Sequence, residues 1–478
     1  MQTVSRVFVA GRLPQIRLAA LASGEVQWPV FALCLALFAG AVAVNGFPFL
    51  ITDTLRYGGA LPGLPDAPVL LNFVMQAPFA LAGFWGSAAA GMLAAAYAAA
   101  RLATHPALRN GWLLFPLVAL VSLQYLYAGM IGTEIWCFIA LALIAAQTEG
   151  RTIWLLDIAL IGIGALSHNS LMAVSLGAIG LTLALFPRHW PKLAAALVGV
   201  LVAMVAEKAI FALTLPGETP MKYTYISGEI LSNHPHIREG FCAEQPEALF
   251  CVSPYAEYIE ARRAAPENQD KIDRKFPLMA SQPFVWGPNS FWTHDSLLPV
   301  EDRMTQAENE AAGKALWDYA LRNHFGSFLA VMPTKIQRFW QFMPPGIFAR
   351  FDTWYADERK HRHTEAWEPA LAGYHDSLQA QGLFLNWRYQ RASQILVRTM
   401  AVVGLLTPLV LLFAARSEVW RLSVLFAGFF LGNLAAVSIA GAIVGRYVER
   451  AYPFLGLNCV LLALVLVEIV RRWRARQA

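Results

Sequence analysis

A short polar stretch, Asn45 to Tyr57, reads NGFPFLITDTLRY and directly follows an apolar run long enough to enter a bilayer. It contains one acid, Asp53, with Arg56 and Tyr57 close behind it. A carboxylate at a membrane surface, beside a cation and a phenol, suits proton transfer during chemistry on a lipid-borne polar group. Asp53 is therefore our candidate general base. The alternative is an N-cap for the following helical turn, a frequent role of aspartate.

Glu134, in the sequence GMIGTEIW, is the competing candidate for the base. A lone glutamate at a helix N-terminus is also what the helix dipole favours, so a purely structural role stays open. Arg446 and Arg450 are four residues apart and would share one face of a helix, with Tyr447 beside them. Because arginine forks match phosphate oxygens in bidentate fashion, we expect both arginines to bind a phosphate. The alternative is that their long side chains reach lipid head groups.

Other candidate binding residues interrupt apolar or aromatic surroundings. His168 and Asn169 stand between two apolar runs, where polar groups usually face a cavity or a partner. They could bind acceptor hydroxyls or a phosphate, or simply form the turn of a helical hairpin. Trp286, Trp292 and His294 belong to the segment FVWGPNSFWTHD. Such aromatic faces could stack on sugar rings, or they could form the core of a small domain.

The elements that must position these residues are membrane helices. The chain has 478 residues, of which 57% are hydrophobic and 14% charged, and its mean hydropathy is +0.46. Soluble domains are about a quarter charged, so this composition indicates a polytopic, all-α membrane protein. The segment from Val69 to Gly83 is apolar but carries polar residues and a proline, which predicts a helix in the membrane interface or one that re-enters. Ten apolar runs have the length that crosses the hydrocarbon of a bilayer: 28–46, 84–103, 111–128, 130–147, 152–167, 170–186, 193–214, 397–415, 420–443 and 453–470.

The basic residues near these runs predict the orientation, because Lys and Arg are retained on the cytoplasmic side. With the N-terminus inside, fourteen cations lie in short inner segments and three in short outer loops. Ten spans then return the C-terminus, with its sequence RRWRAR, to the cytoplasm. No cleavable signal peptide is evident at the basic, mixed start of the chain. We therefore predict a multi-pass membrane protein with both termini in the cytoplasm, whose net charge of +5 reflects its inner segments and not nucleic-acid binding.

A polar insertion at 215–395 separates an N-terminal membrane module, 1–214, from a C-terminal one, 396–478. Loops of such length are usually functional, and we expect a large domain of mixed structure that caps the outer face. Cys242 and Cys251 lie in this insertion, where an oxidising compartment would favour a disulfide over a pair of free thiols. No CxxC spacing supports zinc, and we expect no cofactor.

The pattern resembles the GT-C superfamily of polytopic glycosyltransferases, which use polyprenyl-phosphate sugars. In that family an acid follows the first span, where Asp53 stands in LITDTLRY. An Arg-Tyr pair before a proline often lies near the last span, similar to GRYVERAYPF at 445–454. Members often carry two adjacent acids in the first loop, whereas Asp53 stands alone. The resemblance therefore leaves the second acidic role to Glu134 and gives little support to a bound divalent cation.

The resemblance implies a transferase of a bacterial inner membrane that moves a sugar from a polyprenyl-phosphate carrier to a periplasmic glycan or lipid. A transporter or flippase of lipid-linked glycans is an alternative, but it predicts polar residues along the middle of several spans. An O-antigen ligase, a polymerase or a membrane acyltransferase is a further alternative. An acyltransferase requires a histidine near the centre of a span, and only His168 comes close.

Overall fold

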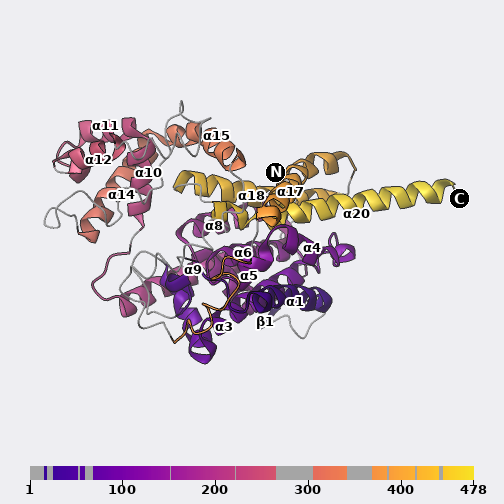
Figure 1. The fold of residues 1–478 in the computed structure, drawn as a ribbon. Coiled ribbons are helices and arrows are strands. Elements are labelled where there is room, and N and C mark those ends of the chain that lie inside the picture. Colours follow the sequence, from indigo (N-terminus) through magenta and orange to yellow (C-terminus); the bar gives the residue numbers. More distant parts are fainter. Residues whose placement is uncertain are drawn as a thin grey trace.

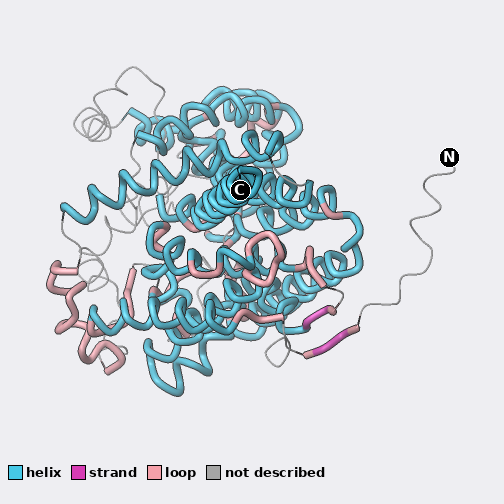
Figure 2. The backbone as a smooth tube through the Cα atoms, turned by 90° about the vertical axis from the view of Figure 1, so that its right-hand side faces the viewer, coloured by secondary structure: helices cyan, strands magenta, loops and turns pink. Residues whose placement is uncertain are grey.

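Figure 1 shows the protein as a computed structural model, an assembly of helices with a long C-terminal helix that projects from it. The structure describes residues 15–18, 25–51, 54–59, 68–150, 152–220, 222–253, 255–264, 305–341, 369–384, 387–414, 417–440 and 445–477. Within these residues the one sheet is a pair of two-residue strands near the N-terminus, β1 (Ile16–Arg17) and β2 (Ile153–Trp154), which run parallel (Figure 2).

One group of helices forms the main body. Its long helices are α1 (Trp28–Asn45), α3 (Val69–Leu102), α6 (Glu134–Ala146), α7 (Leu155–Leu166), α8 (Asn169–Leu185), α9 (Trp190–Thr214), α17 (Trp387–Ala414), α18 (Ser417–Ala440) and α20 (Tyr452–Gln477). Shorter pieces lie between them: α2 (Thr54–Tyr57), η1 (Arg109–Gly111), α4 (Leu114–Val121), α5 (Gln124–Gly129), η2 (Pro187–His189) and α19 (Gly445–Glu449).

Six helical segments of this body are long and apolar enough to cross a membrane: Trp28–Asn45, Val69–Leu102, Pro187–Thr214, Arg391–Ala414, Ser417–Ile439 and Tyr447–Gln477. The protein is therefore a multi-pass membrane protein. The other four predicted spans coincide with shorter helices: α6, α7 and α8 have 13, 12 and 17 residues, and the third predicted span is divided into α4 and α5. Because a straight crossing needs about 20 residues, the described residues contain six candidate spans, and the number ten remains a prediction.

Two sharp breaks occur among the described helices of the main body. Helix α3 bends at Ala82 and Gly83, where Gly83 has φ 58° and ψ −143°. A Cβ on Gly86 would lie only 1.9 Å from the carbonyl oxygen of Pro78, so glycine allows the two parts of α3 to fold closely together. The sequence predicted a separate segment from Val69 to Gly83, and the bend in α3 lies at the end of that segment. The second break falls at Leu123, which has φ 62° between α4 and α5.

The body has one continuous apolar core. Helix α6 lies at its centre, with all of its residues buried. Helices α9 and α17 instead expose large apolar side chains such as Val205, Leu213, Leu409 and Phe413. Exposed apolar side chains in such numbers are what helices in contact with lipid require, because the bilayer and not water is their solvent.

A second group of helices forms a separate lobe, in pink and orange at the upper left of Figure 1. It consists of α10 (Tyr223–Asn233), α11 (Pro235–Glu244), η3 (Leu249–Cys251), α12 (Tyr255–Ala264), α14 (Gln306–Asn323) and α15 (Phe325–Gln341). A small core that includes Phe241, Phe250 and Phe328 holds the lobe together, and a disulfide joins Cys242 to Cys251 as the sequence predicted. The described part of the insertion consists mainly of helices and turns, while residues 265–304 and 342–368 lie outside the described residues, so the expected mixture of helical and irregular chain remains a prediction.

Candidate functional site

The first loop after α1 pairs with the turn that carries Glu134. Helix α1 ends at Gly46, which has φ 81°, and the chain then runs extended. The Phe49 N–H donates to Gly129 O (3.1 Å), and the Ile131 N–H donates to Phe49 O (3.2 Å). The Thr54 hydroxyl donates to Ile131 O at 3.0 Å. These bonds bring the first predicted site segment beside the second.

Asp53 itself lies outside the described residues. The residues that flank it are joined, because the Thr54 N–H donates to Ile51 O (2.8 Å) and the Ile51 N–H donates to the Thr54 hydroxyl (2.8 Å). Arg56 belongs to α2, but its side chain is outside the described part, whereas the Tyr57 side chain is buried.

Glu134 is the first residue of α6 and is fully buried. The partial positive charge at a helix N-terminus stabilises a carboxylate at this position. Its carboxylate lies beside the backbone of Gly132, where an added Cβ would be 2.6 Å from Glu134 Oε2 and 3.3 Å from Ile51 Cδ1. Glu134 therefore borders the first loop, as a second acid of the same site would have to do.

Arg450 is also fully buried, and it connects its own segment with α18 and with the start of α8. Its Nε donates to Asn433 Oδ1 and its Nη2 donates to Ser170 Oγ, both at 2.9 Å. The guanidinium lies 5.5 Å from the ring centroid of Tyr447, a cation–π contact. The Asn433 amide in turn donates to Tyr447 O at 2.8 Å.

His168 completes this group, which we call the Arg450 cluster (His168, Ser170, Asn433, Tyr447 and Arg450). Its ring packs on Tyr447 with centroids 4.6 Å apart, and its Nδ1 lies 2.9 Å from Ser170 Oγ. The side chain also caps α8, since Nδ1 accepts from the Ser170 N–H.

The other predicted binding residues are not part of the Arg450 cluster as far as the structure describes them. The Asn169 side chain is exposed. Arg446 lies in α19, but its side chain is outside the described part of the chain. Trp286, Trp292 and His294 are outside it altogether.

The structure adds a residue pair that sequence reasoning missed. The Tyr127 hydroxyl donates to the Glu449 carboxylate, and both side chains are fully buried. Tyr127 lies in α5, just before the turn that leads to Glu134, and Glu449 directly precedes Arg450. The hydrogen bond between Tyr127 and Glu449 therefore brings the Glu134 turn and the Arg450 cluster close together. The signal available in the sequence was an acid, Glu449, directly before a long apolar helix.

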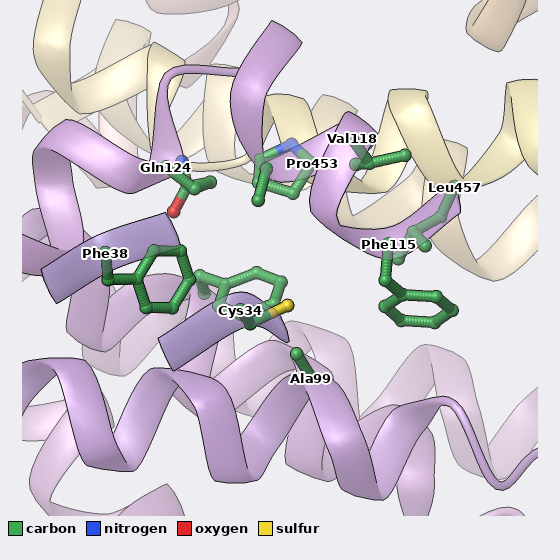
Figure 3. A pocket seen from close by; sticks show the side chains of 10 residues that line it. Cys34, Phe38, Ala99, Phe115, Val118, Gln124, Pro453 and Leu457 are labelled. Atoms are coloured by element: carbon green, nitrogen blue, oxygen red, sulfur yellow. The ribbon is translucent and has the colours of Figure 1, made fainter. Parts of the chain in front are cut away.

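A small cavity of about 20 Å³ lies close to this site, between α1, α3, α4, α6 and α20 (Figure 3). Its walls are almost entirely apolar and include Phe38, Phe115, Phe138 and Leu457. One polar side chain lines it, that of Gln124, which is 2% exposed and has no hydrogen-bond partner among the described residues. The cavity is a packing defect next to the α4–α5 break and contains none of the predicted site residues.

A second buried polar cluster occupies the other end of α6. Asp157 accepts from Tyr97 Oη (2.5 Å), from Arg101 Nε (3.1 Å) and from Arg101 Nη2 (2.9 Å). Gln147, which follows α6, donates to the same carboxylate at 3.3 Å. Arg101 also donates to the backbone oxygen of Glu25 at 2.6 Å. Since the charged groups Asp157 and Arg101 are both bonded to protein partners, the cluster ties helix ends together, as a structural network does.

No group of three or more His, Cys, Asp or Glu side chains within the described ranges could hold a metal ion. Comparison with protein-family models, with curated proteins and with solved structures finds no match to this chain.

Proposed function

We propose that this protein is a membrane glycosyltransferase that transfers a sugar from a polyprenyl-phosphate carrier to a glycan or lipid acceptor. The proposal rests on one observation above the others: a buried arginine, Arg450, directly follows Glu449, whose carboxylate accepts from Tyr127, just before the turn that carries the buried acid Glu134. An acid and an arginine at one membrane face are what transfer from a lipid phosphate requires. The resemblance of LITDTLRY and GRYVERAYPF to GT-C enzymes supports the same reading.

In the proposed reaction an acceptor hydroxyl attacks the anomeric carbon of the sugar. The bond from that carbon to the phosphate oxygen breaks, and the bonding electrons leave with the polyprenyl phosphate. Asp53 takes the hydroxyl proton as general base, with Glu134 as the alternative. Arg446 and Arg450 stabilise the negative charge that the leaving phosphate acquires.

The distribution of buried charge supports an enzyme over a transporter or flippase. A path for a polar head group would need polar side chains along its length. The Glu134 end and the Asp157 end of α6 are about 20 Å apart, the length of this 13-residue helix. Between them, residues 139–144 of α6 are all apolar and at most 1% exposed.

The proposed topology places the Glu134 end, the first loop and the insertion outside the cytoplasm, with both termini inside. The disulfide between Cys242 and Cys251 supports this side for the insertion, since such bonds persist in oxidising compartments. The first loop, the Glu134 turn and the lobe would then face the acceptor.

The test is sugar transfer by the purified protein from a panel of polyprenyl-phosphate hexoses and pentoses, with Asp53→Asn, Glu134→Gln and Arg446→Ala compared with wild type. Loss of a general base reduces the rate by roughly 10²–10⁴-fold. We expect Asp53→Asn to lose transfer and Arg446→Ala to lose donor affinity as well. Transfer at the wild-type rate by all three variants would show that this face is not the active site.

A further inference from the structure

The segment 369–384 belongs to the insertion, yet it packs on the first loop. Its Gln379 side chain is 2% exposed. The carboxamide bonds both polar backbone atoms of Leu50: the Leu50 N–H donates to Gln379 Oε1 (3.0 Å), and Gln379 Nε2 donates to Leu50 O (2.6 Å). A side-chain amide offers a donor and an acceptor as a peptide group does. Gln379 therefore takes the place that a neighbouring strand would have beside Leu50.

The opposite edge of the first loop is occupied by the turn that leads to Glu134. Phe49, the residue before Leu50, exchanges backbone hydrogen bonds with Gly129 and Ile131 on that side. The extended chain at Phe49 and Leu50 is thus held between the turn and Gln379. All four of its backbone polar groups have partners, as buried backbone requires.

Additional contacts fix Gln379 in its place. The Gln379 N–H donates to Asn45 Oδ1 (2.8 Å), and the Leu378 N–H donates to Asn45 O (2.9 Å). Tyr374 packs edge-on against Phe47 with ring centroids 5.8 Å apart. These contacts tie the end of α1 to the same segment, so the Gln379 side chain has little freedom to leave Leu50.

We propose that Gln379 is a positioning residue for the candidate site. It fixes the backbone of the first loop, and through the pairing of Phe49 with Ile131 it fixes the turn that presents Glu134. A segment far along the chain thereby completes the site, and any movement of 369–384 changes the placement of the acid. The effect of Gln379 on sugar transfer rests on the proposed function. Its effect on the backbone of the first loop and on the Glu134 turn does not.

The experiment compares Gln379→Ala with Gln381→Ala in the full-length protein in lipid nanodiscs. Gln381 is the matched control, because it is exposed and its amide donates only within its own segment, to Asp376 O (3.0 Å). Hydrogen exchange should quicken by roughly 30-fold at 45–51 in Gln379→Ala, the effect of losing two ordinary hydrogen bonds. Exchange at 129–134 should quicken with it. Gln381→Ala should match wild type in both ranges.

Two further readouts separate positioning from general damage. Transfer by Gln379→Ala should show a lower kcat, while binding of undecaprenyl phosphate, measured by native mass spectrometry, stays at the wild-type level. Gln379→Met keeps the length of the side chain without a charge and loses both hydrogen bonds to Leu50, so its exchange and its kcat should change as in alanine. This variant also decides the matter if Gln379→Ala does not fold.

Unchanged exchange at 45–51 would overturn the proposal, and so would faster exchange with an unchanged kcat. If the wild type transfers no sugar from any carrier, the proposed function fails. In that case the positioning role of Gln379 is judged by hydrogen exchange alone. It fails as well if exchange at 129–134 stays at the wild-type rate in both Gln379 variants.

Discussion

Replacement of Asp157 by asparagine should strongly destabilise the helix bundle. The Asp157 carboxylate is fully buried and forms an ion pair with Arg101, whose side chain is 2% exposed, at 2.9 Å. Asparagine keeps the size of the side chain but removes its charge. The Arg101 guanidinium would then stay buried with its nearest counter-charge, Glu25, at 3.5 Å and itself partly exposed. Removal of one partner of a buried pair costs about 3–5 kcal/mol.

The assay is the free energy of unfolding in mixed detergent micelles, measured for Asp157→Asn beside a matched control. Glu418→Gln removes the same kind of charge from an exposed ion pair, with Arg188 at 2.9 Å. Such surface pairs contribute about 0–1 kcal/mol. A double replacement, Arg101→Met with Asp157→Leu, should recover much of the loss, since apolar pairs often replace buried ion pairs without cost. Equal, small effects of Asp157→Asn and Glu418→Gln would refute the reasoning.

Three further outcomes are expected. Glu207 accepts from the first two backbone N–H groups of α3, at 2.9 and 2.7 Å. Glu207→Gln should therefore increase hydrogen exchange at the start of α3 by an amount that corresponds to about 1.5–3 kcal/mol. Exchange at the wild-type rate would contradict this prediction. Burial lowers the pKa of His105 from its ordinary 6.5 to about 4, although Glu149 lies 3.3 Å away. Between pH 6.5 and 4 the unfolded chain therefore binds a proton that the folded chain does not, and the free energy of unfolding should fall by about 3 kcal/mol as the pH drops through this window. His105→Gln should flatten this pH dependence, and an equal slope in both proteins would contradict the prediction. Replacement of Cys242 and Cys251 by serine should destabilise the lobe by about 2–3 kcal/mol without preventing membrane insertion, and limited proteolysis at wild-type rates would speak against it.

The sequence predicted the membrane character and most of the helices because apolar run length is a local property. The orientation predicted from the basic residues also places the first loop, Glu134, His168 and Arg450 on one side of the membrane, and this placement remains a prediction. The α4–α5 break could not be predicted in the same way. Leu123 adopts φ 62° with neither glycine nor proline beside it, so tertiary packing imposes a conformation that its own sequence disfavours.

The contacts that complete the site are the least visible in the sequence. Tyr127 and Glu449 are 322 residues apart, and Leu50 and Gln379 are 329 apart. Nothing in local periodicity or spacing links such residues, because their approach depends on the order in which whole helices pack. Glu449 and Gln379 are ordinary residues in the sequence and become buried hydrogen-bonding groups only in the fold.

The most direct test of the account is an experimental structure of the protein with undecaprenyl phosphate bound. We expect the phosphate to lie within hydrogen-bonding distance of Arg450 or Arg446, on the side of the Arg450 cluster that faces the Glu134 turn. A phosphate bound at the opposite end of α6, beside Arg101 and Lys192, would contradict the proposed site and the proposed direction of transfer.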